Sequence, residues 1–474
     1  MKTSSRAKQD KTKKIHWIWL LLAVFIAKEL VWAYVTPPWQ APDELGHYGY
    51  IESLAEGELP LLGETKIPKK IELTVNDPTF VRAYEPGEGL NYIAQHPPLY
   101  YALLLPFYLC LQQNNPAVAL FILRCIGILL GAVTLFFTYK IVQKTLPQKT
   151  WLQIAIVSGI AFLPMFSYTI AVLNNDNLVA ALSAILIYFL VNQNQEKIEW
   201  SLTVGLLFGF AALTKYTALT LVFGIIFVQL LQFFQTKSST LKKKIFINTV
   251  VIFATAFVIA GWWYIRNYIE LKSFFPDLKQ AVSIHPEILK QYPYLPSFFP
   301  EIASTALPNL GFVSFLFKEG FLVEYYKSIW GNFGKFILTN IQYFFIFIVS
   351  GLSFLGYAKE GYLKLIAKKK PIEMMGKNPI PHLFFLPMLL SVCAILSMKL
   401  FEIAQGRGVL GALNGRYFFS TLVPFFYFFI MGLSHLLPSV WRKYEQYFFG
   451  ILIVLFIFND FYTLYNVLIP NIIV

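Results

Sequence analysis

The stretch 117–139 reads AVALFILRCIGILLGAVTLFFTY, and Arg124 is its only charged residue. An α-helix needs about 20 predominantly apolar residues to cross the hydrocarbon core of a bilayer, and this stretch is long enough. It therefore predicts a membrane-spanning helix. Arg124 is unusual there, because a charged side chain at membrane depth is costly and often marks a functional position.

The composition of the whole chain also indicates a membrane solvent. Of its 474 residues, 57% are hydrophobic and only 14% are charged, whereas soluble proteins average about 25% charged residues. A chain this apolar cannot cover a globular surface. The formal charge of +13 would suggest nucleic acid as a partner of a soluble protein. Here membrane topology explains the charge better, and no nucleic-acid partner is expected.

Hydropathy predicts an all-α polytopic membrane protein with about 11 transmembrane helices, within a range of about 10 to 13. The predicted spans are 15–35, 117–139, 150–170, 177–193, 199–215, 217–235, 245–264, 335–357, 380–400, 416–436 and 446–468. The run from Leu99 to Leu111 is also apolar but too short to span. It is predicted to lie in the membrane interface or to re-enter from it.

The basic residues predict the orientation of the bundle, because short cytoplasmic loops are enriched in lysine and arginine. With the N-terminus in the cytoplasm, every dense basic cluster falls on one side: within 2–14, 140–149, 237–244 and 359–377, and at Arg442 and Lys443. Counting 99–111 as a further span would invert the later loops. We therefore expect a basic cytoplasmic tail over 1–14 and a single integral membrane domain over 15–474.

Two long loops lie on the outer side in this topology. The first covers about 36–116 and is rich in acidic residues, and the second covers about 268–334 and contains the proline-rich stretch HPEILKQYPYLPSFFP. Loops longer than about 15 residues usually carry function or are disordered. Amphipathic pieces of the first loop, such as YGYIESLAEGELP, predict short interfacial helices within it.

Polar side chains from separate segments converge on the outer face. They are Asp43, Glu44 and His47 after the first span, His96 at the end of the same loop, Arg124 in the second span, Asp176 in LNNDN, Lys215 in LTKYT, Arg266 in YIRN, Trp330 and Phe333 in SIWGNFG, and Arg416 in NGRYF. Convergence on one face indicates a site more strongly than any single residue does.

The chemistry of these residues suggests two groups. Asp43, Glu44 and Asp176 are able to supply a general base or to position an acceptor hydroxyl or amine. Lys215, Arg266 and Arg416, with Arg124 as an outlier, are suited to hold a phosphate, because arginine offers a bidentate fork and lysine a point charge. A base beside a phosphate clamp at a membrane surface suits the transfer of a group from a lipid phosphate.

Each of these residues also has a structural interpretation, which the sequence leaves open. Asp43 and Glu44 fit the N-terminus of a helix, and Asp176 fits a helix cap. Lysine side chains snorkel to the interface, as Lys215 would here. The arginines can pair with acids for structure alone, the histidines can be structural, and Trp330 can belong to the interfacial aromatic belt.

Two further charges have no explanation in the sequence. Lys28 and Glu29 stand side by side inside the first predicted span. Their depth is unusual for charged residues, which either pair with one another or snorkel to the interface.

The order of the outer-face motifs resembles the GT-C superfamily of polyprenyl-phosphate-dependent glycosyltransferases, which includes protein O-mannosyltransferases and aminoarabinose transferases. Within that group the chain resembles most a bacterial membrane-protein family of long-unassigned function. The resemblance runs from about residue 30 to about 425. The matching residues are Pro42, Asp43, Glu44, His47, His96, Pro97, Pro98, Asn174, Asp176, Thr214, Lys215, Arg266, Asn267, Trp330, Gly331, Phe333, Gly334, Gly415, Arg416 and Tyr417.

This resemblance implies a GT-C-like bundle in the bacterial inner membrane with its active face extracytoplasmic. The implied donor is a sugar on a polyprenyl phosphate, and the implied acceptor is an envelope glycan, lipid or protein. The implied reaction inverts the anomeric centre. The catalytic acid maps to Asp43 or Glu44, with the first acid favoured, and the second-loop acid maps to Asp176.

The implied substrate pocket and cofactors follow from the same motifs. The pocket residues would be His47, His96, Asn174, Asn267, Trp330 and Tyr417. No cofactor is expected to be required. A divalent cation is possible, because some GT-C members bind one, and its ligands would be Asp43 and Asp176.

Two other function classes compete with a glycosyltransferase. A transporter or flippase of lipid-linked glycans would place its site near the membrane midplane, often with broken helices and internal repeats. A non-catalytic scaffold for envelope assembly would tolerate loss of the acids and the basic residues together. Charged residues in the centre of the bundle would favour the transporter.

Overall fold

The computed structural model describes residues 2–67, 69, 88–192, 197–293, 295, 321–331, 338–366 and 415–469. Over these ranges the chain is helical, and the only β-type pairing is an isolated antiparallel bridge between Lys66 and Leu90. The predicted all-α polytopic fold is confirmed. The predicted span 380–400 and the motif residues Phe333 and Gly334 lie outside the described residues.

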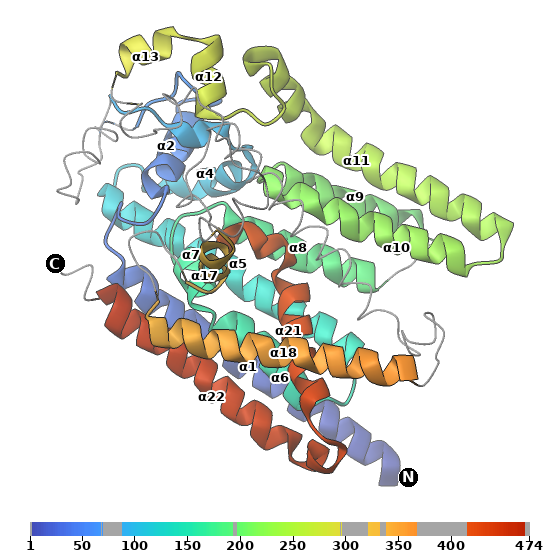
Figure 1. The fold of residues 1–474 in the computed structure, drawn as a ribbon. Coiled ribbons are helices and arrows are strands. Elements are labelled where there is room, and N and C mark those ends of the chain that lie inside the picture. Colours follow the sequence, from blue (N-terminus) through green and yellow to red (C-terminus); the bar gives the residue numbers. More distant parts are fainter. Residues whose placement is uncertain are drawn as a thin grey trace.

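Seven helices of the described part are long and apolar enough to cross a membrane (Figure 1). They are α1 (Lys2–Val35), α5 (Pro116–Thr145), α10 (Leu221–Gln235) with η2 (Tyr216–Thr220), α11 (Ser239–Leu271), α18 (Asn340–Ile366), α21 (Leu422–Leu436) with η4 (Gly415–Thr421), and η5 (Ser439–Tyr444), α22 (Glu445–Thr463) and η6 (Leu464–Leu468) together. The count of eleven spans is not confirmed.

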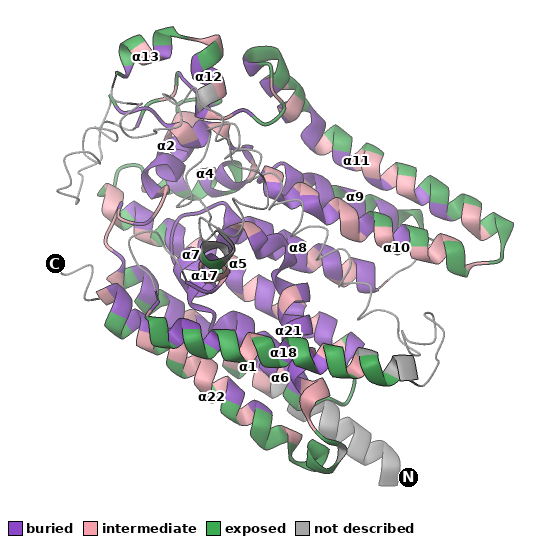
Figure 2. Cartoon of the chain, in the orientation of Figure 1, coloured by how far each residue is buried: buried purple, intermediate pink, exposed green. Residues whose placement is uncertain are grey.

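Three other apolar helices are shorter than a full span. They are α4 (Leu99–Leu111), α8 (Asp176–Val191) and α9 (Ile198–Ala212). The 16 residues of α8 extend about 24 Å at 1.5 Å per residue, less than the roughly 30 Å hydrocarbon core. Most of α8 is buried by its neighbours (Figure 2). The apolar run at 99–111 forms a helix with the predicted bounds and packs on α2 (Glu44–Ala55).

The predicted single span 150–170 is instead two helices. These are α6 (Thr150–Ala161) and α7 (Pro164–Ile170), which are bent by 56° at a short break. Pro164 is the first residue of α7, where its missing N–H costs nothing, but its ring prevents continuation of the preceding helix. The bend turns α7 toward the loop 171–175, which leads into α8.

Short elements form a cap at one end of the bundle, where α2, α4, α12 (Leu278–Ile284) and α13 (Glu287–Gln291) lie together in Figure 1. The first long loop also contains η1 (Tyr92–Gln95). A small apolar cluster joins the two long loops across the cap, with Leu62 and Leu90 from the first and Leu278 and Ile288 from the second. The described parts of the two loops therefore pack against each other at the cap end.

The outward faces of the peripheral helices are apolar and exposed. Figure 2 shows this exposure along α11, α18 and α22, with Phe257, Phe354 and Val454 each more than 60% accessible. Large apolar side chains in this position are expected to face lipid. Several charged side chains, such as Glu44, Asp176 and Lys215, are nevertheless buried inside the protein.

We predict that Gly356→Ala destabilises the protein, because α18 and α21 touch through glycine. A Cβ atom at Gly356 would overlap the backbone carbonyl of Gly432, and an overpacked helix contact costs about 1–3 kcal/mol. A lower midpoint of thermal unfolding in detergent is the expected result.

Gly351→Ala is the matched control on the same helix. A Cβ atom at Gly351 meets nothing within 4 Å, and alanine favours a helix over glycine by about 1 kcal/mol. The control is expected to unfold at the same or a higher temperature. Equal destabilisation by both substitutions would contradict the close α18–α21 packing.

Candidate functional site

Asp43 precedes α2 and faces a cation. It is a half-buried residue in the left-handed region, with φ of 68°, which a short polar side chain tolerates better than most. Its carboxylate accepts hydrogen bonds from the Tyr92 hydroxyl and from the Arg416 guanidinium. Tyr92 comes from η1, and Arg416 from η4. Two segments distant in sequence thus meet at one acid.

Asp176 is the second acid of the site and is completely buried at the start of α8. Its Oδ2 lies 2.8 Å from the Lys215 ammonium and 3.5 Å from Nε of Arg416. The amide oxygen of Asn174 accepts the backbone N–H of Asp176 at 2.9 Å. Oδ1 of Asp176 has no hydrogen-bond partner among the described residues.

These contacts form a continuous chain of alternating charges. It runs from Lys215 through Asp176 and Arg416 to Asp43. Lys215 lies in the turn between α9 and η2, and its ammonium is 5.2 Å from the centre of the Tyr417 ring. Two cations balance two carboxylates, so the group is neutral overall and tolerates burial better than any one of its charges would.

The Arg416 cation keeps Asp43 ionised. Burial is the largest single influence and raises the pKa of Asp43, but the charge of Arg416 and the hydrogen bonds from Arg416 and Tyr92 together outweigh it. The pKa of Asp43 is therefore held well below its usual range. The carboxylate remains charged at neutral pH and is able to accept a further hydrogen bond.

Two neutral histidines lie beside the charge chain. Burial lowers the pKa of His47 to about 3, and burial together with the charge of Lys215 lowers the pKa of His96 well below its usual value. The two rings stack at 6.4 Å, and Nδ1 of His47 is 2.9 Å from the Tyr101 hydroxyl. His96 also stacks on Tyr216. Together they form an aromatic wall suited to the faces and hydroxyls of a sugar.

Glu44, although next to Asp43, has a different environment. Its Oε1 and Oε2 lie 2.8 Å and 2.6 Å from the guanidinium of Arg124, and both side chains are buried. Glu44 also accepts the backbone N–H groups of Leu173 and Trp39. The pair therefore joins the first residues of α2 to α5 and to the loop before Asp176.

Arg124 has no donor left for a ligand. Besides Glu44, it donates to the carbonyls of Ala33, Thr36 and Pro37 at 2.8, 2.6 and 3.1 Å. These bonds use all the N–H groups of a guanidinium. The contacts of Arg124 therefore do not support its predicted phosphate-binding role. Its side chain instead bonds the carbonyl groups at the C-terminal end of α1.

Residues 95–263 match the family model of dolichyl-phosphate-mannose-protein mannosyltransferases. The match covers roughly a third of the chain. The matched stretch includes His96, Asp176 and Lys215, whereas Asp43 and Arg416 lie outside it. No curated protein matches the chain.

Two solved structures illustrate the range of similar folds. The oligosaccharyltransferase AglB from Archaeoglobus fulgidus, in complex with an inhibitory peptide and a dolichol-phosphate, has a TM-score of 0.49 and 11% identity, covering 97% of this chain and 56% of its own. ArnT from Cupriavidus metallidurans, bound to undecaprenyl phosphate, has a TM-score of 0.39 and 12% identity, covering 89% and 78%. The chain thus spans little more than half the length of the archaeal enzyme.

Two predicted site residues lie at the cap end of α11. Arg266 donates to the carbonyls of Pro60 and Leu59 at 3.1 and 3.3 Å, and its guanidinium lies 5.0 Å from the Trp263 ring. It fastens the first long loop to α11. Asn267 is buried beside it.

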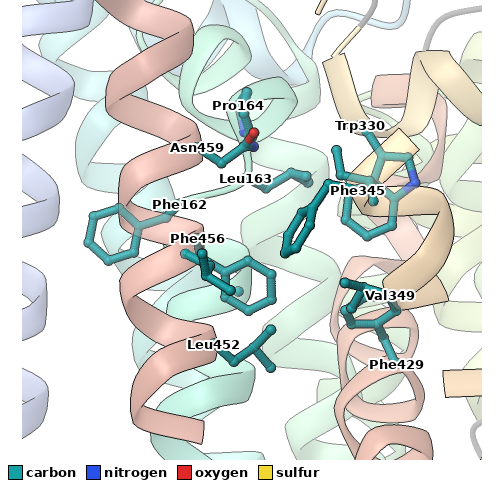
Figure 3. A pocket seen from close by; sticks show the side chains of 13 residues that line it. Phe162, Leu163, Pro164, Trp330, Phe345, Val349, Phe429, Leu452, Phe456 and Asn459 are labelled. Atoms are coloured by element: carbon teal, nitrogen blue, oxygen red, sulfur yellow. The ribbon is translucent and has the colours of Figure 1, made fainter. Parts of the chain in front are cut away.

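Trp330 lies in an apolar environment. It belongs to α17 (Phe321–Gly331) and packs against Phe425, Phe426 and Phe429 of α21. It lines an apolar pocket between the α6–α7 break, α18, α21 and α22, in which Asn459 is the polar exception (Figure 3). The tryptophan contributes to packing rather than to the charge chain.

The predicted divalent-cation site is not supported by a set of metal ligands in the described ranges. No three His, Cys, Asp or Glu side chains come together there as metal ligands. The two acids proposed for a cation both contact Arg416. A guanidinium thus occupies the position between them that a divalent ion would need.

Sequence reasoning missed Tyr92 and Tyr101. Both are tyrosines of the first long loop near His96, and their hydroxyls contact Asp43 and His47. Their only signal was position, four residues before and five after the histidine of QHPP. Aromatic residues are abundant throughout this chain, so proximity alone did not distinguish these two.

We predict that breaking the Glu44–Arg124 pair unfolds the cap end. Glu44→Gln leaves Arg124 charged and buried without its counter-ion, and removal of one partner of a buried pair costs about 3–5 kcal/mol. A large fall in the thermal unfolding midpoint is expected.

Glu58→Gln is the control, because Glu58 is an exposed acid just beyond α2. Surface substitutions of this kind usually change stability by less than about 0.5 kcal/mol. A Glu44→Gln protein as stable as this control would show that the pair is not a structural anchor.

Proposed function

We propose that this protein is a glycosyltransferase that moves a sugar from a polyprenyl-phosphate donor to an acceptor at the extracytoplasmic face of the membrane. The observation that carries the proposal is the balanced chain of Lys215, Asp176, Arg416 and Asp43 at the cap end of the bundle. In this chain two cations lie beside an ionised acid, which supports a phosphate-binding pair next to a base. The match to the mannosyltransferase family model supports the same reaction class.

The donor phosphate would bind between Lys215 and Arg416. Both cations contact carboxylates, and an incoming phosphate would offer each of them a further anionic acceptor. The exchange brings one anion into a group that was neutral. Arg416 binds through its planar fork and Lys215 as a point charge, while Asp176 keeps both cations in place.

Asp43 would act as the general base. When Arg416 turns to the phosphate, Asp43 loses its strongest counter-charge, and the pKa of Asp43 rises toward its usual value. The carboxylate thereby becomes a better proton acceptor at the moment when the donor is bound. An acceptor hydroxyl or amine would then be activated only in the presence of the donor.

The reaction itself is a single displacement. The acceptor atom attacks the anomeric carbon on the face opposite the phosphate, and a new bond forms between them. The bond from that carbon to the phosphate oxygen breaks, its electron pair leaves with the lipid phosphate, and the proton of the acceptor passes to Asp43. The anomeric configuration is inverted.

A second candidate function is a transporter of lipid-linked glycans. It is favoured by a cluster of charged residues inside the bundle, formed by Lys28, Glu29 and Asp460. A transport site would need to expose such groups to a substrate. These side chains are at most 3% accessible and are bonded to one another, which favours the enzyme.

We predict that Asp43→Asn abolishes sugar transfer. The purified protein in lipid nanodiscs would be given a panel of polyprenyl-phosphate sugars, and release of polyprenyl phosphate would be measured. Loss of a general base lowers kcat by about 10²–10⁴-fold. Glu58→Gln is the control and is expected to match the wild type.

Release of lipid phosphate at equal rates from the wild type and from Asp43→Asn would remove Asp43 from the chemistry. The transporter would be favoured over the enzyme if the wild type released no polyprenyl phosphate from any donor, while vesicles containing the same protein moved lipid-linked glycans across their membrane.

We predict that Lys215→Met weakens donor binding. Loss of a charge-assisted contact to phosphate costs about 1.5–3 kcal/mol, or roughly 10- to 150-fold in affinity. The measurement is the Kd of unlabelled polyprenyl phosphate. Lys290→Met, which removes an exposed lysine of α13, is expected to bind like the wild type. Identical affinity in both variants would place the phosphate elsewhere.

A further inference from the structure

A second set of charges lies deep in the bundle, away from the proposed site. Lys28 and Glu29 of α1 meet Asp460 of α22, with ammonium-to-carboxylate distances of 2.8 Å to each acid. All three side chains are buried. Ser167 of α7 completes the group, and its hydroxyl donates to Oδ1 of Asp460 at 2.7 Å.

The group is centred on the break between α6 and α7. The Lys28 ammonium donates to the carbonyl of Ala161 and to the hydroxyl of Ser167, each at 2.7 Å. Ala161 is the last residue of α6, where helix carbonyls lack intrahelical partners. Lys28 therefore satisfies a backbone group that the Pro164 bend left open, and ties both sides of the bend to α1.

The far end of α7 is fastened by the proposed site. Glu44 accepts the backbone N–H of Leu173 at 3.0 Å, and the side-chain amide of Asn177 donates to the carbonyl of Val172 at 3.0 Å. The segment that ends in Asp176 is thus held at two points. One lies inside the bundle and the other at the cap end.

We propose that Lys28 and Asp460 are positioning residues for the sugar transfer proposed above, on which this inference rests. They fix the start of α7 against α1 and α22, and through α7 they fix the loop 171–175 and the carboxylate of Asp176. Asp176 holds both Lys215 and Arg416. A shift of this loop would turn the phosphate-binding pair, and the donor that it holds, out of line with Asp43, while both cations stay available to bind.

Packing alone does not require these charges. A buried ion pair replaced by apolar groups of similar volume is often as stable or more stable. What an apolar pair lacks is direction, because it provides no bond to Ala161 or Ser167. The pair therefore determines the position of α7, and a neutral substitution separates positioning from stability.

The experiment uses Lys28→Met/Glu29→Gln/Asp460→Asn in the full-length protein in nanodiscs. This combined variant removes all three charges of the group together, so no charge stays buried without a partner and the variant is expected to unfold near the wild-type temperature. Backbone amides of 171–177 are expected to exchange with deuterium about fivefold faster. The kcat for sugar transfer is expected to fall about tenfold, with the donor KM within about twofold of wild type.

Gln342→Leu is the matched control. The side-chain amide of Gln342, in α18, donates to Asn459 and Thr463 of α22, each at 2.9 Å. The substitution therefore removes buried polar contacts of the same helix α22 that do not involve α7. Its kcat and the exchange of 171–177 are expected to match the wild type. A comparable loss of kcat in this control would show that the effect comes from a general destabilisation of α22 and not from the position of α7.

The remaining outcomes are decisive in either direction. Unchanged kcat in an active protein overturns the proposal, whether or not exchange increases, and so does a fall in kcat without faster exchange at 171–177. Inactivity of the wild type with every donor refutes the proposed function instead. If the combined variant fails to fold, Ser167→Ala replaces it, because it leaves the ion pairs intact. This substitution is expected to lower kcat about threefold and to speed the exchange of 171–177.

Discussion

The buried pair of Glu44 and Arg124 is the interaction on which the candidate site depends. Two charges removed from water are expensive, and their attraction offsets that cost only when every donor and acceptor is satisfied. Arg124 meets this condition by bonding Glu44 and three carbonyls at the end of α1, and Glu44 by accepting two further backbone N–H groups. The pair thus sets where α2 begins and where Asp43 lies.

Neutrality governs the site itself. Lys215, Asp176, Arg416 and Asp43 alternate in sign, so the group can be buried before any ligand is present. A phosphate bound as proposed would take the place of Asp43 at Arg416, while Asp176 retains both cations. Such a ligand would compete with an internal ion pair rather than with water, which would favour selectivity over raw affinity.

The bend at Pro164 shows how an irregular backbone is tolerated inside a bundle. Backbone groups freed in a membrane protein must find partners within the protein, since lipid offers none. Lys28 supplies that partner at Ala161, and Asp460 supplies its counter-charge. Charged residues that look anomalous along α1 are therefore explained by a break in a helix more than 130 positions later in the chain.

By itself the sequence determined the solvent of this protein, the all-α class and most helix positions, because these follow from the local length and hydropathy of each segment. It also placed Asp43, Asp176, Lys215 and Arg416 among the residues of one face, and the structure brings these four together. Only the tertiary structure decided which neighbours pair. Adjacent residues on a helix point in different directions, so Asp43 faces Arg416 while Glu44 faces Arg124. The sequence also predicted Arg124, Arg266 and Trp330 as site residues, because residue type and position along the chain do not distinguish them from the other four. The partners of a side chain depend on helices that are distant along the chain.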